Sequence, residues 1–285
     1  MAHLEKRMLG LTADLSSVVA KLADDKAAPK NVHHLRTTIR RIESLVSYAN
    51  PDLGKKLERS LEKMADLRKR AGKVRDLDVQ AGLLDALGNG STARDRKALA
   101  ELLEKKRDRH ARRLVSAVRK VQESKFFARM NRIAEESGAV PEGKNRPLAP
   151  LEEAKVQLAE MATDFSSHQE IKLNRLHSAR VSLKRLRYLA ELAEESAEQK
   201  DFIQKLKAVQ DAVGDWHDWQ ELTNTAEKRF SDRVNCALLR EVRALLAARH
   251  ATAIFSLNNL FALALAPAKK PPRAASPVRA LAQHA

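Results

Sequence analysis

Apolar residues recur along most of the chain at alternating steps of three and four positions, the spacing of one buried face on an amphipathic helix. The first series consists of Leu4, Met8, Leu11, Leu15, Val18 and Leu22. Comparable series predict seven further helices, over residues 30–49, 55–87, 93–136, 151–164, 171–196, 200–229 and 232–265. With abundant Ala, Leu, Glu, Lys and Arg and only nine glycines, the pattern predicts an all-α protein.

Two stretches interrupt the helical pattern and suggest how the chain is divided. Prolines and glycines without periodicity predict a linker over residues 138–150. It separates a first four-helix half, residues 1–137, from a second four-helix half, residues 151–265, so we expect two similar bundles. The last segment, residues 266–285, is rich in Ala, Pro, Lys and Arg and predicts a disordered basic tail.

The two halves share an order of residues that indicates an internal duplication. The helix over 30–49 carries four basic residues on the arc opposite its apolar stripe: His33, Arg36, Arg40 and Arg41. The helix over 171–196 repeats the order with His177, Arg180, Lys184 and Arg185. Later in each half, Gly72 and Asp76 recur as Gly214 and Asp218. A surface that only needs to be soluble has no reason to repeat its charge order.

Composition narrows the classes of partner. Lys and Arg outnumber Asp and Glu by 53 to 37, for a formal net charge of +16, which favours a polyanion. Only 4% of residues are aromatic, which disfavours single-stranded nucleic acid because its bases need stacking platforms. The single cysteine, Cys236, excludes an intrachain disulfide framework. Without a signal-peptide pattern or a run of about 20 apolar residues, we expect a cytoplasmic protein that does not bind membranes.

The repeated basic residues are of the types that bind phosphate. Guanidinium, ammonium and imidazole N–H groups all donate to phosphate oxygens. Arg36 and Arg40 lie one helical turn apart, where like charges repel by a few tenths of a kcal/mol per pair. A bound anion would remove this repulsion. If the two bundles face each other through these helices, the result is a long cationic groove.

These motifs, together with Val74-Arg75-Asp76-Leu77-Asp78-Val79 and Leu206-Lys207-Ala208-Val209-Gln210-Asp211-Ala212-Val213-Gly214-Asp215, resemble the conserved histidine α-helical domain, the CHAD family. The resemblance covers about residues 4–265. It implies two four-helix bundles related by a pseudo-twofold axis and non-catalytic binding of inorganic polyphosphate in a basic cleft, without a cofactor. It also implies association with polyphosphate granules. The polyphosphate-binding residues that we expect are His33, Arg36, Arg40, Arg41, Arg75, His177, Arg180, Lys184, Arg185, Arg187 and Tyr188.

Some roles remain open from the sequence. Asp76 and Asp218 either orient the basic side chains or form ordinary interhelical ion pairs. Trp216 and Trp219 align with apolar residues of the first half, so we expect them in the core.

Two alternative functions are compatible with the pattern. The net charge and the basic tail would suit a nucleic-acid-binding protein. His177, His217, Asp218 and Asp232 follow the ligand order of the helical metal-dependent phosphohydrolases, although the equivalent of His217 in the first half is Arg75.

Overall fold

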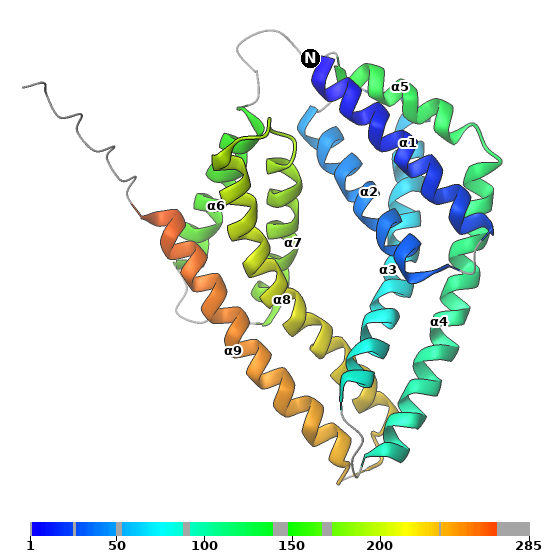
Figure 1. Cartoon of the computed structure of the whole chain (residues 1–285), viewed down its shortest axis with the longest axis vertical. Helices are drawn as coiled ribbons and strands as arrows, with labels where there is room; N and C mark the ends of the chain where they lie inside the picture. Colours follow the sequence, from blue (N-terminus) through cyan, green and yellow to red (C-terminus); the bar gives the residue numbers. More distant parts are fainter. Residues whose placement is uncertain are drawn as a thin grey trace, which may run out of the picture.

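The computed structural model describes residues 2–24, 27–49, 53–87, 92–138, 148–166, 173–233 and 235–266. Within these ranges every regular element is an α-helix, which confirms the all-α prediction (Figure 1). The helices are α1 (Ala2–Asp24), α2 (Pro29–Ala49), α3 (Lys55–Ala86), α4 (Ala93–Gln122), α5 (Phe126–Gly138), α6 (Pro150–Ser166), α7 (Leu173–Ala190), α8 (Ala197–Arg229) and α9 (Ala237–Leu265). Among the described residues, no helix is both long enough and apolar enough to cross a bilayer.

The single helix predicted over 93–136 is wrong, because the chain turns between α4 and α5. Ser124 closes the turn by donating both its backbone N–H and its hydroxyl to the carbonyl of Val121, at 3.2 and 2.8 Å. The turn redirects the apolar face of α5, including the buried Phe126 and Met130, into the core that α1 also lines. The first half of the chain therefore contains five helices within the described ranges, rather than the four that we predicted.

The connection between α7 and α8 also differs from the sequence prediction, because α7 ends at Ala190 and not near residue 196. Ser196 caps α8 by accepting a hydrogen bond from the backbone N–H of Gln199 at 3.0 Å. The side-chain amide of Gln199 in turn donates to the carbonyl of Ala190, at the end of α7. These bonds hold the two helix ends together and leave Glu191 in the connection. Helix α9 likewise begins later than predicted, at Ala237 rather than residue 232.

Figure 1 shows the helices as two arms that meet where the end of α3 and the start of α4 lie beside the end of α8 and the start of α9. An apolar core fills this junction and joins Leu84 and Leu99 from one arm to Trp219, Phe230 and Leu238 from the other. At the opposite end, the core of the first arm also includes residues of the second arm. They are Leu151 and Ala154 of α6, Leu189 and Ala190 of α7, and Leu192, which follows α7. The arms are thus joined by apolar packing at both ends.

A third core lies within the second arm, where α6, α7, α8 and α9 pack together around Leu183, Leu206 and Trp216. Trp216 and Trp219 are both buried, as predicted. Between the two joined ends, α2 lies against α7 and α3 lies against α8. Most of the predicted linker (residues 139–147) and nearly all of the predicted tail (residues 267–285) lie outside the described residues.

Candidate functional site

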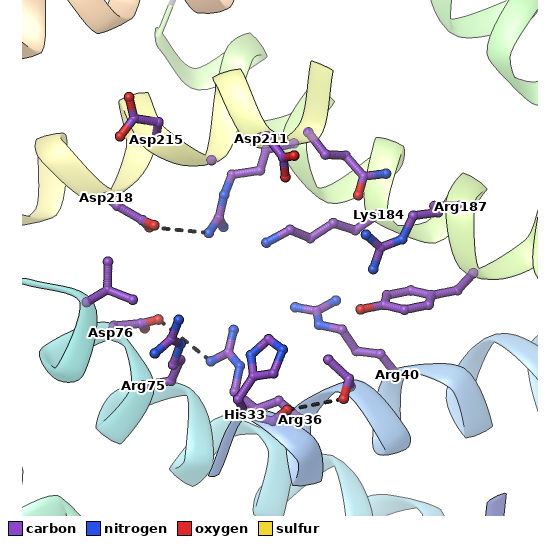
Figure 2. Close-up of a pocket in the computed structure, with 16 residues that line it drawn as sticks. His33, Arg36, Arg40, Arg75, Asp76, Lys184, Arg187, Asp211, Asp215 and Asp218 are labelled. Carbon is purple, nitrogen blue, oxygen red and sulfur yellow. Dashed lines mark hydrogen bonds and ion pairs between the residues drawn. The ribbon is translucent and has the colours of Figure 1, made fainter. Parts of the chain in front are cut away.

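A cavity of about 460 Å³ lies between the two arms, where α2 and α3 face α7 and α8 (Figure 2). Both copies of the basic motif contribute to it. The residues that line it are His33, Arg36, Thr37, Arg40, Arg75, Asp76, Val79, Arg180, Lys184, Arg187, Tyr188, Gln210, Asp211, Gly214, Asp215 and Asp218. The structure therefore brings together eight of the eleven residues that the sequence indicated.

The apolar stripes of α2 and α7 orient these cations. Leu35 and Ile39 are fully buried in the first core, and Leu183 and Leu186 are buried in the second arm. Because residues on the opposite arc of a helix point away from its buried stripe, Arg36, Arg40, Arg180 and Lys184 project toward the cavity. Figure 2 shows Lys184 and Arg40 extending toward each other from the two sides.

Each basic helix is paired with an aspartate of the following long helix. Arg36 Nη1 lies 3.7 Å from Asp76 Oδ1, and Arg180 Nη2 lies 3.7 Å from Asp218 Oδ1. The two pairs occupy equivalent places in the predicted repeat. The arginine side chains are only 17% and 13% exposed and so lie in the cavity wall, whereas the carboxylates of Asp76 and Asp218 are 51% and 32% exposed and stay partly open to solvent. Nε of Arg180 is buried without a hydrogen-bond partner.

The cavity concentrates positive charge away from water. Burial is the largest cause of a lowered pKa for Arg36, Arg40 and Arg180, and neighbouring arginines lower each pKa further. The effect is strongest at Lys184, where burial and then Arg180, Arg40 and Arg36 lower the pKa to about 7. Asp218 raises this pKa, but it does not offset the other contributions. The protonated forms are therefore destabilised in the ligand-free protein.

The lining is not uniformly basic, because α8 contributes a row of carboxylates, of which the sequence analysis had identified only Asp218. Asp211, Asp215 and Asp218 are spaced i, i+4 and i+7 and so share one face of α8. Asp215 pairs with Arg249 at 2.7 Å. With Asp76, the lining holds four carboxylates and six cations, which are Arg36, Arg40, Arg75, Arg180, Lys184 and Arg187. Before histidine is counted, the lining keeps an excess of two positive charges when Lys184 is protonated and of one when Lys184 is neutral.

Three of the predicted residues do not line this cavity. Arg41 Nε donates to Glu191 Oε2 at 3.0 Å, and Arg185 Nη2 donates to Ser47 Oγ at 3.4 Å beside a smaller cavity of about 190 Å³. The ring of His177 lies 5.3 Å from that of His217, centroid to centroid. Burial, and then Arg180 and His177, lower the pKa of His217 to about 3, so this imidazole is neutral at physiological pH.

A glycine allows Arg36 to approach α3 closely. A Cβ atom at Gly72 would lie 2.6 Å from Arg36 Nη1, which is closer than real contacts allow. The guanidinium thus packs against the backbone of α3, one turn before Asp76. The equivalent glycine of the second half, Gly214, has open space at this point.

The alternative function of a metal-dependent phosphohydrolase requires a cluster of metal ligands. Within the described ranges, no group of three or more His, Cys, Asp or Glu side chains is arranged to hold a metal ion. Asp218, which that alternative requires as a ligand, is instead the ion-pair partner of Arg180.

Comparisons with known proteins agree with the fold. A family model described as the CHAD domain matches residues 10–227. The crystal structure of the CHAD domain from the plant Ricinus communis superposes with a TM-score of 0.68 at 17% identity, covering 92% of this chain and 91% of that one. PptA from Streptomyces chartreusis superposes with a TM-score of 0.61 at 16% identity, covering 92% and 98%. No curated protein matches the chain significantly.

The lowered pKa of Lys184 predicts that the free energy of unfolding depends on pH. Its pKa is about 7 in the folded protein and 10.5 ordinarily, so the unfolded chain binds more protons between these values. The free energy of unfolding should therefore rise as pH increases through this window. Lys184→Met removes the titration while keeping a similar shape. We expect this variant to be more stable than the wild type at about pH 6, by a margin that shrinks toward about pH 9. Urea unfolding across this range measures the margin, and a margin that does not change with pH would contradict the assignment.

Proposed function

The chain belongs to the CHAD domain family, and from this premise we propose that it binds inorganic polyphosphate, without catalysis, in the cavity between α2 and α7. The observation that supports this most is the gathering of buried cations from both helices in one cavity, with too few carboxylates to neutralise them. The buried positions of Arg36, Arg40, Arg180 and Lys184 make each of them a costly charge in the absence of an anion.

A polyanion suits this arrangement better than a single small anion. Charge-assisted hydrogen bonds are worth roughly 1.5–3 kcal/mol each when well made, and the cations approach the cavity from two sides. A chain of phosphates presents oxygens to both sides at once. Binding would also relieve the repulsion between Arg36 and Arg40, which lie one turn apart on α2.

The aspartates fit a role in positioning. Asp76 and Asp218 each lie 3.7 Å from one terminal nitrogen of a guanidinium, which leaves the other terminal nitrogen for phosphate. Both carboxylates are the ion-pair partners of arginine, which supports our proposal of a binding protein rather than a hydrolase. A protein that binds this polymer in the cytoplasm would be carried to polyphosphate granules.

Nucleic-acid binding is the second candidate, and a separate surface favours it. Burial and the neighbouring charges of Lys73, Arg113, Arg109 and Lys106 lower the pKa of His110. Lys73, Arg109 and Arg113 are exposed, whereas Lys106 and His110 are half-buried, and we call these five residues of α3 and α4 the α3–α4 patch. Duplex DNA could bind there through its phosphates, with a steep dependence on salt.

Two matched variants separate these candidates. Replacing Arg36, Arg40, Arg180 and Lys184 with alanine removes four charges from the cavity without touching the apolar stripes. We expect about a thousandfold or greater loss of polyphosphate affinity, since several charge-assisted bonds disappear together. The control variant removes four charges from the α3–α4 patch, by alanine at Lys73, Lys106, Arg109 and Arg113. We expect it to keep polyphosphate affinity within about threefold.

Isothermal titration calorimetry at fixed salt measures both affinities, with circular dichroism to verify the fold. Excess duplex DNA should not displace long-chain polyphosphate from the wild-type protein. Equal losses in the two variants would indicate binding by net charge alone and would refute the assigned site. Displacement of polyphosphate by DNA would favour the second candidate.

Gly72 provides a finer test of the site. Gly72→Ala forces the guanidinium of Arg36 away from α3, because the flexible end of Arg36 can move more easily than the helix. We expect about a tenfold loss of polyphosphate affinity, the equivalent of one charge-assisted bond. Stability should rise by up to about 1 kcal/mol, since alanine is the better helix former.

Gly82→Ala is the matched control, because Gly82 lies in the same helix and has open space at its Cβ position. It should gain similar stability and keep full affinity. Indistinguishable affinities of the two alanine variants would show that the close approach of Arg36 to Gly72 has no part in binding.

A further inference from the structure

A single carboxylate, that of Glu191, holds two arginines beside the cavity. Arg41 Nε donates to Glu191 Oε2 at 3.0 Å, and Arg187 Nε lies 3.4 Å from Glu191 Oε1. Arg187 lines the cavity, and Arg41 directly follows the lining residue Arg40 on α2. Figure 2 shows Arg40 and Arg187 at the end of the cavity opposite the two arginine–aspartate pairs. Glu191 therefore engages one arginine from each basic helix at this end.

The position of Glu191 is electrostatically unfavourable without these partners. It is the first residue after α7, and its backbone N–H still bonds to the carbonyl of Arg187. A negative charge at the C-terminal end of a helix is disfavoured by the helix dipole. The side chain is nevertheless only 18% exposed. The surrounding guanidinium groups are what stabilise the carboxylate there.

A third arginine approaches from α1. Burial lowers the pKa of Arg7, while Glu191 raises it and Arg41 lowers it, so Arg7 lies within electrostatic reach of both side chains. Glu195 also raises this pKa, but its side chain is 80% exposed and pairs with Lys200 at 3.1 Å. Arg41 of α2 and Arg187 of α7 thus contact one half-buried carboxylate, and Arg7 of α1 lies within its electrostatic reach.

We propose that Arg7, Arg41 and Arg187 form a second phosphate subsite, which extends the cavity for long polyphosphate chains and which Glu191 occupies until such a chain displaces it. This inference rests on the proposed binding of polyphosphate in the cavity. Carboxylate and phosphate oxygens accept hydrogen bonds from the same guanidinium donors. Glu191 and a phosphate group therefore compete for Arg41 and Arg187.

The competition makes Glu191 a determinant of chain-length preference. Tripolyphosphate bound by Arg36, Arg40, Arg180 and Lys184 leaves Arg187, at the end of the cavity, and the rest of the subsite to Glu191. A long chain bound in the same cavity holds its next phosphates beside the three arginines, at a high effective concentration. The long chain can then displace the carboxylate, and part of the affinity gained is lost in breaking the Glu191 contacts.

Calorimetric titration of Glu191→Gln with tripolyphosphate and with long-chain polyphosphate tests the subsite. Glutamine keeps the shape but holds the arginines less tightly. We expect about a tenfold gain in affinity for the long chain, which corresponds to about 1.4 kcal/mol, and less than about a twofold change for tripolyphosphate. Glu195→Gln is the matched control, because it removes the same charge nearby without releasing Arg41 or Arg187. It should not raise the affinity for the long chain more than the affinity for tripolyphosphate.

Adding Arg41→Ala to Glu191→Gln should abolish the gain for the long chain, because the released arginine is then missing. Equal effects of the two glutamine variants, or a gain that persists in the double variant, would overturn the subsite while leaving cavity binding intact. Failure of the wild-type protein to bind either polyphosphate would overturn the proposed function, and the subsite with it.

Discussion

The site depends on burying cations that the protein does not fully neutralise. Removing a charged group from water is costly, and the cost rises when like charges are buried together. Arg36, Arg40, Arg180 and Lys184 all have lowered pKa values for this reason, and Asp76 and Asp218 offset only part of the cost. The ligand-free protein is therefore less stable than an apolar filling of the same cavity would make it. An anion supplied from outside reverses each of these unfavourable contributions, which is why the arrangement suits binding.

The fold sustains this arrangement because the two arms are fixed at both ends. The junction core around Trp219 and Phe230 joins the arms at the neighbouring ends of α3, α4, α8 and α9. Leu151 and Leu189 join the first core at the other end. Packing at both ends resists both a separation of α2 from α7 and their closure onto the cations. The cavity is thus formed before a ligand arrives, so little binding energy is spent on ordering it.

Periodicity in the sequence predicted the helices well, because burial of an apolar stripe leaves a regular signal, and Leu35 and Ile39 are buried as that signal requires. The turn between α4 and α5 was missed because neither glycine nor proline marks it. The order of basic residues correctly indicated both helices of the cavity. It could not separate Arg40 from Arg41, or Lys184 from Arg185, since neighbours on a helix differ by about 100° and only the packed partner helix decides which one faces inward. The repeat singled out Asp218, but not Asp211 and Asp215, because their relevance depends on knowing which helices face each other. Glu191 was undetectable, because its contact with Arg41 joins residues that are distant in sequence.

The central claim is that polyphosphate binds between the two basic helices, and a crystal structure of the protein with a bound polyphosphate chain tests it most directly. The account predicts phosphate groups in the cavity, with oxygens within hydrogen-bond distance of Arg36 and Arg40 on one side and of Arg180 and Lys184 on the other. Phosphate groups confined to the α3–α4 patch, beside an empty cavity, would contradict it.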